Sequence, residues 1–343
     1  MVRAAPPVAQ ATRLLGKLFI GLACLAGLTA AIGAAYQSIS VFRDRRHYPM
    51  PGRMVDVGGY KMHIYCTGQG TPAVILDSGL GDSFTSWRKV QPQVAQFTRV
   101  CSYDRAGLGY SDPSPSSRTS RDIAQELHRL LHNAGIPAPV VMVGHSMAGY
   151  DVRLYAGLYR NEVAGVVLVD ASHPDQERRF PAALKEMDAG VDHEVEIEKL
   201  LMPFGIPRLF ASRDPAACCH NTAADRAAQC NLHAVSEGQS EFRSFSESAA
   251  QAAATGSLGN IPLVVLSHDP GQPEPGIPAD LGKTIDDDWG KMQQELAELS
   301  SKGMRTIAKN SGHYIQLDRP DVVVEAVRNI VEQISRAQSD SRH

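Results

Sequence analysis

The stretch VVMVGHSMAG at residues 140–149 joins a short, mostly β-branched run to a segment with helical spacing. The run predicts a buried strand, and the Gly-His-Ser that ends it predicts a sharp turn into a helix. Because such a turn presents its central side chain outward, Ser146 is a candidate nucleophile. Ala148 stands where the usual G-x-S-x-G pattern has its second glycine, and Gly149 follows one place later. The alternative interpretation is a serine that only caps the helix.

A serine hydroxyl is a weak nucleophile and needs a base within hydrogen-bonding distance. The chain has 12 histidines, most of which must be structural or exposed. His313 differs from the others because it follows the last predicted strand, at residues 304–308. Loops at the carboxyl ends of parallel strands border the ligand-binding crevice of open α/β sheets. We therefore expect His313 to be the base. His145 adjoins the serine, but its side chain should leave the turn in another direction.

An acidic partner for His313 is expected at the end of another strand. Asp170 follows the predicted strand at residues 163–169, and Asp269 follows the predicted strand at residues 261–266. Either carboxylate could hold the imidazole in the tautomer that a base needs. We prefer Asp170 because it adjoins its strand tightly, whereas the loop after the second strand is long and rich in proline and glycine.

Two backbone amides are candidates for stabilising negative charge on a reaction intermediate. The loop DSGLG at residues 77–81 follows a predicted strand at residues 73–76, and its glycines would let the Leu80 amide point at the charge. The Met147 amide stands at the start of the helix after Ser146, where the helix dipole adds to its effect. The alternative interpretation of the loop is a plain glycine turn.

Predicted strands and helices alternate along most of the chain, which favours a mostly parallel sheet covered on both faces. Two strands flanking Gly58-Gly59 predict a hairpin, and residues 84–97 predict a helix that Pro92 kinks or breaks. Residues 172–259 lack a strand pattern and predict a mainly helical insertion. The aspartates at 286–288 are expected to begin the helix predicted at residues 289–299.

The N-terminal region differs from the rest of the chain. Residues 18–42 contain no charged side chain, and residues 18–36 are almost wholly apolar or small. Nineteen helical residues span about 28 Å, close to the roughly 30 Å of a bilayer core. The basic residues at positions 3, 13 and 17 favour a single-pass signal anchor whose following domain lies outside the cytoplasm. Small residues at 30–35 leave a cleaved signal peptide and a secreted protein as the alternative. A buried soluble helix is the third interpretation.

The bulk properties exclude few functions. A net charge of −3 and the absence of a basic cluster beyond the N-terminal region argue against nucleic acid as a partner. The six cysteines form no CxxC pair, so a zinc site is not expected. A bridge from Cys218 or Cys219 to Cys230 is one possibility in an oxidising compartment, and buried free thiols are the other.

Four motifs, in this order, resemble the α/β-hydrolase superfamily over about residues 53–337. They are DSGLG at 77–81, DRAGLGYS at 104–111, the turn around Ser146, and SGH at 311–313. The resemblance implies an eight-stranded, mostly parallel sheet with a helical cap inserted after strand six, here preceded by an apolar helix. We predict a core at residues 49–171 and 260–340, a cap at 172–259, and an N-terminal anchor or signal segment with its linker at 1–48.

In this family the nucleophile follows strand five and the histidine follows strand eight, which matches Ser146 and His313. The acid usually follows strand seven, which matches Asp269. In some capped branches similar to haloalkane dehalogenases it follows strand six, which matches Asp170. Those dehalogenases and similar epoxide hydrolases use an aspartate nucleophile, so the serine argues against both activities.

These observations together predict a serine hydrolase that cleaves a carboxylic ester or related acyl bond through an acyl-enzyme, without a cofactor or a metal. A perhydrolase, a C–C hydrolase or an acyltransferase would use the same residues, since a fold does not fix a function. A catalytically silent, membrane-anchored binding protein is the alternative that is not an enzyme. The expected partners are a small ester or acyl substrate and the membrane.

Overall fold

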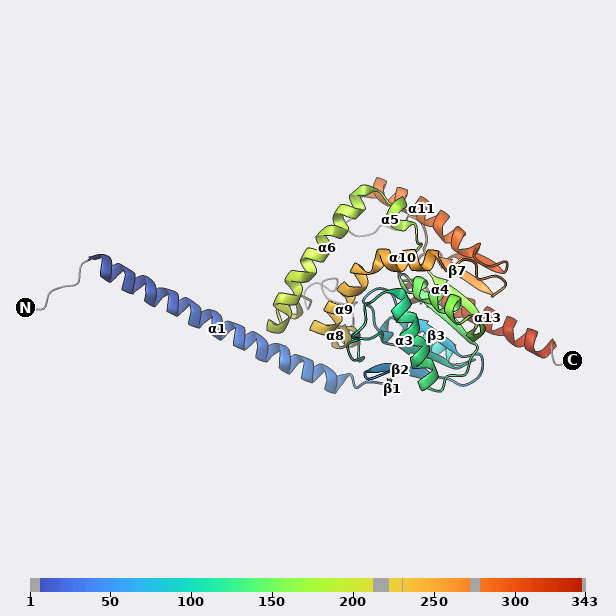
Figure 1. Ribbon diagram of the computed structural model, residues 1–343, viewed down its shortest axis with the longest axis horizontal. Coiled ribbons are helices and arrows are strands. Elements are labelled where there is room, and N and C mark those ends of the chain that lie inside the picture. Colours follow the sequence, from blue (N-terminus) through green and yellow to red (C-terminus); the bar gives the residue numbers. More distant parts are fainter. Residues whose placement is uncertain (1–6, 212–221, 230, 272–277, 341–343) are drawn as a thin grey trace, which may run out of the picture. The chain divides into compact units, whose positions relative to one another are not determined.

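The computed structural model describes residues 7–211, 222–229, 231–271 and 278–340 (Figure 1). The chain divides into two compact units, each built from two segments. The smaller unit consists of residues 1–49 and 196–232, and the larger consists of residues 50–195 and 233–343. The larger unit contains the whole sheet and every candidate site residue.

Eight strands form one sheet: β1 (Arg53–Asp56), β2 (Lys61–Thr67), β3 (Val74–Asp77), β4 (Val100–Tyr103), β5 (Val140–His145), β6 (Val163–Val169), β7 (Leu263–Ser267) and β8 (Gly303–Ile307). Their spatial order is β1-β2-β4-β3-β5-β6-β7-β8. The β1–β2 and β2–β4 pairs are antiparallel, and all the other pairs are parallel. This confirms the predicted eight-stranded, mostly parallel sheet, with Gly58-Gly59 at the turn of the β1–β2 hairpin.

Apolar side chains cover both faces of the sheet, as a parallel sheet rich in valine and leucine requires. One face packs against α3 (Ser120–Asn133), α4 (Ala148–Leu158) and α10 (Phe245–Ala253). The other packs against η1 (Phe84–Trp87), α2 (Gln91–Val94), α12 (Ile315–Asp318) and α13 (Pro320–Asp340). The helical stretch predicted at residues 84–97, with a kink or break at Pro92, consists of two short helices, and Pro92 lies in the first turn of the second.

A disulfide joins Cys66 of β2 to Cys101 of β4, at positions directly opposite each other in the antiparallel ladder. No pattern in the sequence indicates this pair. The suggested bridge from Cys218 or Cys219 to Cys230 lies outside the described residues. Among the described cysteines, Cys24 is free and exposed.

The described parts of the insertion between β6 and β7 are helical, as predicted. In chain order they are α5 (Gln176–Arg179), α6 (Ala182–Leu201), η3 (Met202–Phe204), α7 (Ile206–Ala211), α8 (Ala223–Gln229), α9 (Leu232–Arg243) and α10. The division between the two units falls inside α6 and again at the start of α9, so each unit holds part of the insertion. The predicted cap boundaries at residues 172 and 259 stay a prediction.

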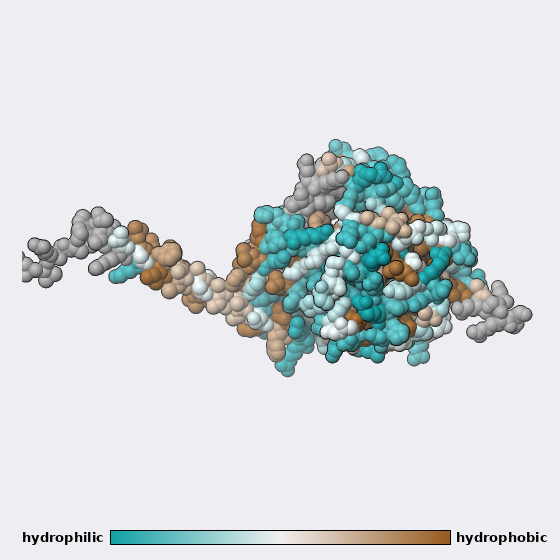
Figure 2. Space-filling model, in the orientation of Figure 1, coloured by the Kyte–Doolittle hydropathy of each residue, from teal (hydrophilic) through white to brown (hydrophobic). Residues whose placement is uncertain are grey.

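The N-terminal helix α1 (Pro7–His47) is long and exposes apolar side chains along most of its length, which appear brown in Figure 2. Residues 15–47 are long and apolar enough to cross a membrane, by length and composition alone. A signal sequence near the N-terminus would meet the same criterion.

Helix α11 (Ala279–Ala297) lies beside β7 and β8 (Figure 1). The aspartates at 286–288 are in its middle, so the prediction that they begin a helix is wrong. The helix starts earlier, at Ala279, with Pro278 at its N-cap. Its first half carries few apolar residues, and for that reason its pattern is weak in the sequence. A short turn, η2 (Arg160–Glu162), completes the described elements.

Candidate active site

Ser146 lies on the turn between β5 and α4, as the sequence predicts. Its φ is +54°, a left-handed conformation that residues other than glycine rarely adopt and that is common at functional sites. A Cβ on Gly144 would lie 2.6 Å from the carbonyl oxygen of Ala148, and a Cβ on Gly149 would lie 2.6 Å from the Cβ of Ala171. The close contact at position 149 explains why the second glycine stands there and not at position 148, because α4 meets the segment after β6 at Gly149.

His313, in the loop after β8, contacts Asp170, which directly follows β6 and is fully buried. The His313 Nδ1 lies 2.6 Å from the Asp170 Oδ2. Burial raises the pKa of Asp170, but hydrogen bonds from His268 and His313 outweigh it and hold this pKa well below its usual range. Asp170 is therefore an ionised carboxylate that orients the His313 ring. An imidazole held through Nδ1 accepts a proton at Nε2.

Asp269, the alternative acid, has other partners. Its carboxylate accepts hydrogen bonds from Lys309 Nζ and from the backbone amide of Asn310, both at 2.9 Å. The Asn310 hydrogen bond contributes most to lowering the pKa of Asp269, followed by Lys309. Asp269 thus ties the loop after β7 to the loop after β8, and Asp170 is the carboxylate in contact with His313.

His145, at the end of β5, links the turn to the His313 loop. Its Nε2 lies 3.1 Å from the backbone carbonyl oxygen of His313, which can only accept, so Nε2 carries the hydrogen. Burial lowers the pKa of His145 to about 3, and the nearby His313 contributes in the same direction. His145 is therefore neutral, and its hydrogen bond connects the turn that bears Ser146 to the loop that carries His313.

The loop after β3 approaches the turn closely. A Cβ on Gly79 would lie only 3.3 Å from the Cβ of Ser146, so the absence of a side chain at Gly79 permits this approach. Leu80 follows Gly79 directly. Met147 follows Ser146 and is fully buried at the start of α4. The two candidate amides therefore belong to segments that flank the serine.

Side chains from two other elements hold the loop after β3 in place. Arg105, after β4, donates to the backbone carbonyls of Ser78 at 2.5 Å and Gly79 at 2.6 Å. The same guanidinium forms a buried ion pair at 2.6 Å with Glu241 of α9, and Glu241 also accepts from the Gly81 amide at 2.9 Å. Because the carbonyls and amide are bound to one buried ion pair, the backbone of this loop is rigidly positioned.

Two side chains that the sequence analysis missed also bind Asp170. Trp289 Nε1 of α11 donates to Oδ1 at 2.8 Å. His268 donates through its backbone amide to Oδ1 at 3.0 Å, and its Nδ1 lies 2.9 Å from Oδ2. A signal for His268 was present, because it follows β7 directly and precedes Asp269, which the same strand-end reasoning singled out. Trp289, inside a helix, carried no such signal.

The sheet topology and the serine turn at the end of β5 define the class as a hydrolase-type α/β protein. The family model described as "Alpha/beta hydrolase family" matches residues 74–326, and the chain belongs to this family.

Among curated proteins, the uncharacterized protein YbdG of Bacillus subtilis is 25% identical over 166 residues, which cover 48% of this chain and 51% of YbdG. The chain thus spans about half the length of that relative.

Two solved structures have the same fold. An esterase from Thermogutta terrifontis is similar with a TM-score of 0.60 and 20% identity, over 82% of this chain and 98% of the esterase. The Cif epoxide hydrolase from Acinetobacter nosocomialis is similar with a TM-score of 0.67 and 15% identity, over 87% of this chain and 96% of that protein. Identities this low establish the shared fold alone.

Proposed function

We propose that this protein is a serine hydrolase that cleaves a carboxylic ester or related acyl bond. The observation that carries the proposal is the 2.6 Å contact between His313 and Asp170, in loops that lie beside a strained turn bearing Ser146. A serine, an imidazole and a buried carboxylate in this arrangement suit acyl transfer. The aspartate nucleophile of dehalogenases and epoxide hydrolases has no counterpart at position 146.

In the proposed reaction, the Ser146 Oγ attacks the carbonyl carbon while the His313 Nε2 takes the hydroxyl proton. The amides of Leu80 and Met147 stabilise the oxyanion. The intermediate collapses when His313 returns the proton to the leaving alcohol, and an acyl-serine remains. A water molecule then attacks the acyl carbon with His313 as base, releasing the acid and restoring Ser146. Asp170 orients His313 and stabilises its positive charge in both steps.

The protein should be labelled at Ser146 by a fluorophosphonate probe and should hydrolyse p-nitrophenyl esters. We expect hydrolysis to extend beyond the acetate to medium and long acyl chains, because the helical insertion offers apolar residues for an acyl pocket. Rates across a chain-length series, with labelled peptides identified by mass spectrometry, are the measurement. Labelling without ester hydrolysis would instead favour a perhydrolase, a C–C hydrolase or an acyltransferase, and no labelling would favour a silent binding protein.

We further propose that α1 is retained as a single-pass anchor with the larger unit outside the cytoplasm. The disulfide between Cys66 and Cys101 supports an oxidising compartment, because such bonds are rare in the cytosol. Packing within the smaller unit supports retention of the helix. Gly33 of α1 lies so close to Phe204 of η3 that a Cβ on this glycine would be 2.5 Å from the Phe204 carbonyl oxygen.

Further contacts lie beyond the small-residue run at positions 30–35. Tyr36 packs on Gly205, and Asp44 forms an ion pair with Arg208 of α7. These contacts bind α1 to the insertion within and after the run where a signal peptidase would cut. The same unit also exposes Leu200 (70%) and Leu209 (50%), which suits a position next to lipid.

We therefore expect the mature protein to keep its N-terminal helix and to stay in the membrane pellet after alkaline carbonate extraction. Intact mass and N-terminal peptide mapping of the purified protein are the measurements. A Gly33→Leu variant should loosen the packing on Phe204 and make residues 202–211 more sensitive to protease. Gly27→Leu is the matched control, since a Cβ on Gly27 would meet nothing within 4 Å. A soluble protein that begins between residues 31 and 36 would contradict the anchor.

A further inference from the structure

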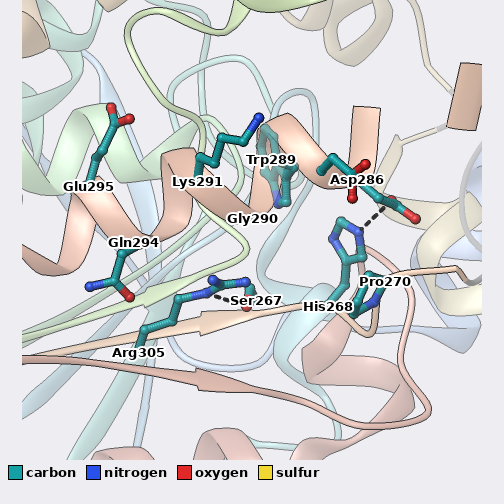
Figure 3. A pocket seen from close by; sticks show the side chains of 11 residues that line it. Ser267, His268, Pro270, Asp286, Trp289, Gly290, Lys291, Gln294, Glu295 and Arg305 are labelled. Carbon is teal, nitrogen blue, oxygen red and sulfur yellow. Dashed lines mark hydrogen bonds and ion pairs between the residues drawn. The ribbon is translucent and has the colours of Figure 1, made fainter. Parts of the chain in front are cut away.

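His268 lies between two carboxylates in the larger unit. Its Nδ1 is 2.9 Å from the Asp170 Oδ2, and its Nε2 is 3.2 Å from the Asp286 Oδ1 of α11, as Figure 3 shows for the second contact. Carboxylate oxygens only accept hydrogen bonds, so both ring nitrogens must donate. An imidazole that donates twice is the protonated imidazolium.

The surroundings of His268 support this protonation state. Burial lowers the pKa of His268, but its hydrogen bonds and charge interactions with Asp170 and Asp286 outweigh burial and raise this pKa to about 9. The second Asp286 oxygen accepts from the Gly271 amide at 2.6 Å, which fixes the carboxylate facing the ring. His268 therefore carries a positive charge at neutral pH.

Both histidines that contact Asp170 use the same oxygen. The Nδ1 atoms of His313 and His268 lie 2.6 Å and 2.9 Å from Oδ2, so the two rings are within about 5.5 Å of each other at these nitrogens. A fixed positive charge at this distance disfavours a second positive charge on His313. The carboxylate that stabilises protonated His313 is thereby shared with a permanent cation.

We propose that His268 is a positioning residue for the Ser146–His313–Asp170 machinery: it holds the Asp170 carboxylate and places a fixed positive charge beside the His313 ring. This inference rests on the proposed function, because it assigns a role to His268 through His313.

A cavity of about 540 Å³ lies beside His268, between α11 and the ends of β7 and β8 (Figure 3). Its charged lining groups besides His268 and Asp286 have their own partners. These groups are Asp287 with Lys283, Lys291 with Asp288, Glu295 with Arg179, and Arg305 with Ser267. Asp286 is thus the carboxylate of the cavity lining that pairs with the His268 ring. The cavity also leaves room for a longer side chain at position 268.

The test is the rate of Ser146 phosphonylation by a fluorophosphonate probe, measured against pH, since this rate reports the base without a known substrate. In His268→Gln the positive charge is lost, so a second positive charge on His313 is less disfavoured. Because only neutral His313 activates the serine, we expect the acidic limb of the profile to move up by about one pH unit. The plateau rate at high pH should fall by less than about tenfold.

His268→Lys should restore the limb to within about 0.3 pH unit of wild type, because it keeps a cation beside the cavity. His128→Gln is the matched control: His128 pairs with Glu162 at 3.1 Å, away from the candidate site, and its variant should have the wild-type profile. A purely structural His268 would give a lower plateau in both the Gln and Lys variants with no movement of the limb, and that result would overturn the inference.

Failure of the proposed function gives a different result. If the wild-type protein is not labelled at Ser146, both the proposed function and the role of His268 are wrong. If the wild type is labelled and the limb is unmoved in His268→Gln, the role of His268 alone is wrong.

Discussion

Replacing Ser146 by alanine should abolish fluorophosphonate labelling and reduce ester hydrolysis by about 10⁵–10⁶-fold. The residual rate would come from the oxyanion donors and from substrate binding, which do not need the hydroxyl. The fold should be preserved, because alanine bears the same φ strain at +54° as serine and the turn is held by backbone hydrogen bonds. Steady-state rates with the best p-nitrophenyl ester, together with thermal unfolding, are the measurements.

Ser335→Ala is the matched control for Ser146→Ala. Ser335 lies on α13, and its hydroxyl donates to the Val331 carbonyl of the same helix at 2.9 Å, so this variant should keep the wild-type rate and labelling. If the Ser146→Ala variant hydrolysed esters at the wild-type rate, Ser146 would be excluded as the nucleophile. The proposed acyl-enzyme route would then have to be abandoned.

The sequence predicted the sheet because its parallel strands are buried on both faces and read as short apolar runs between turn residues. The runs at residues 140–143 and 163–169 are of this kind, and a candidate site residue follows each of them, Ser146 after the first and Asp170 after the second. Strand ends of a parallel sheet meet at one edge, so Asp170 and His313, 143 positions apart, could be expected to lie close together. This physical rule needs no side-chain detail.

The choice between Asp170 and Asp269 depended on side-chain contacts that periodicity does not reveal. The Asp269 carboxylate is bound by Lys309 and by the Asn310 amide, and no pattern in the sequence predicts these partners. The same limit hid the contact of Asp286, in the middle of α11, with His268. The disulfide was missed for a related reason, because it requires the β2–β4 register that sets Cys66 opposite Cys101.

Asp170→Asn should lower the rate of ester hydrolysis by up to about 10⁴-fold. An asparagine can present its amide NH₂ to the His313 Nδ1, which then becomes an acceptor, so the proton moves to Nε2 and blocks that nitrogen from acting as a base. The substitution also removes the negative charge that stabilises protonated His313 and His268. The loss should appear in kcat and in the rate of Ser146 phosphonylation alike, because both depend on the same base.

Asp269→Asn separates this effect from a general disturbance of the strand ends. It removes the same charge from the neighbouring strand end, where the carboxylate binds Lys309 and the Asn310 amide, and an asparagine oxygen can still accept one of these hydrogen bonds. We therefore expect near-wild-type turnover for Asp269→Asn. Because Asp170 is buried and accepts from His313, His268 and Trp289, thermal unfolding must establish that the assayed Asp170→Asn protein is folded. Folded Asp170→Asn with near-normal turnover, together with an inactive Asp269→Asn, would transfer the role of the acid to Asp269.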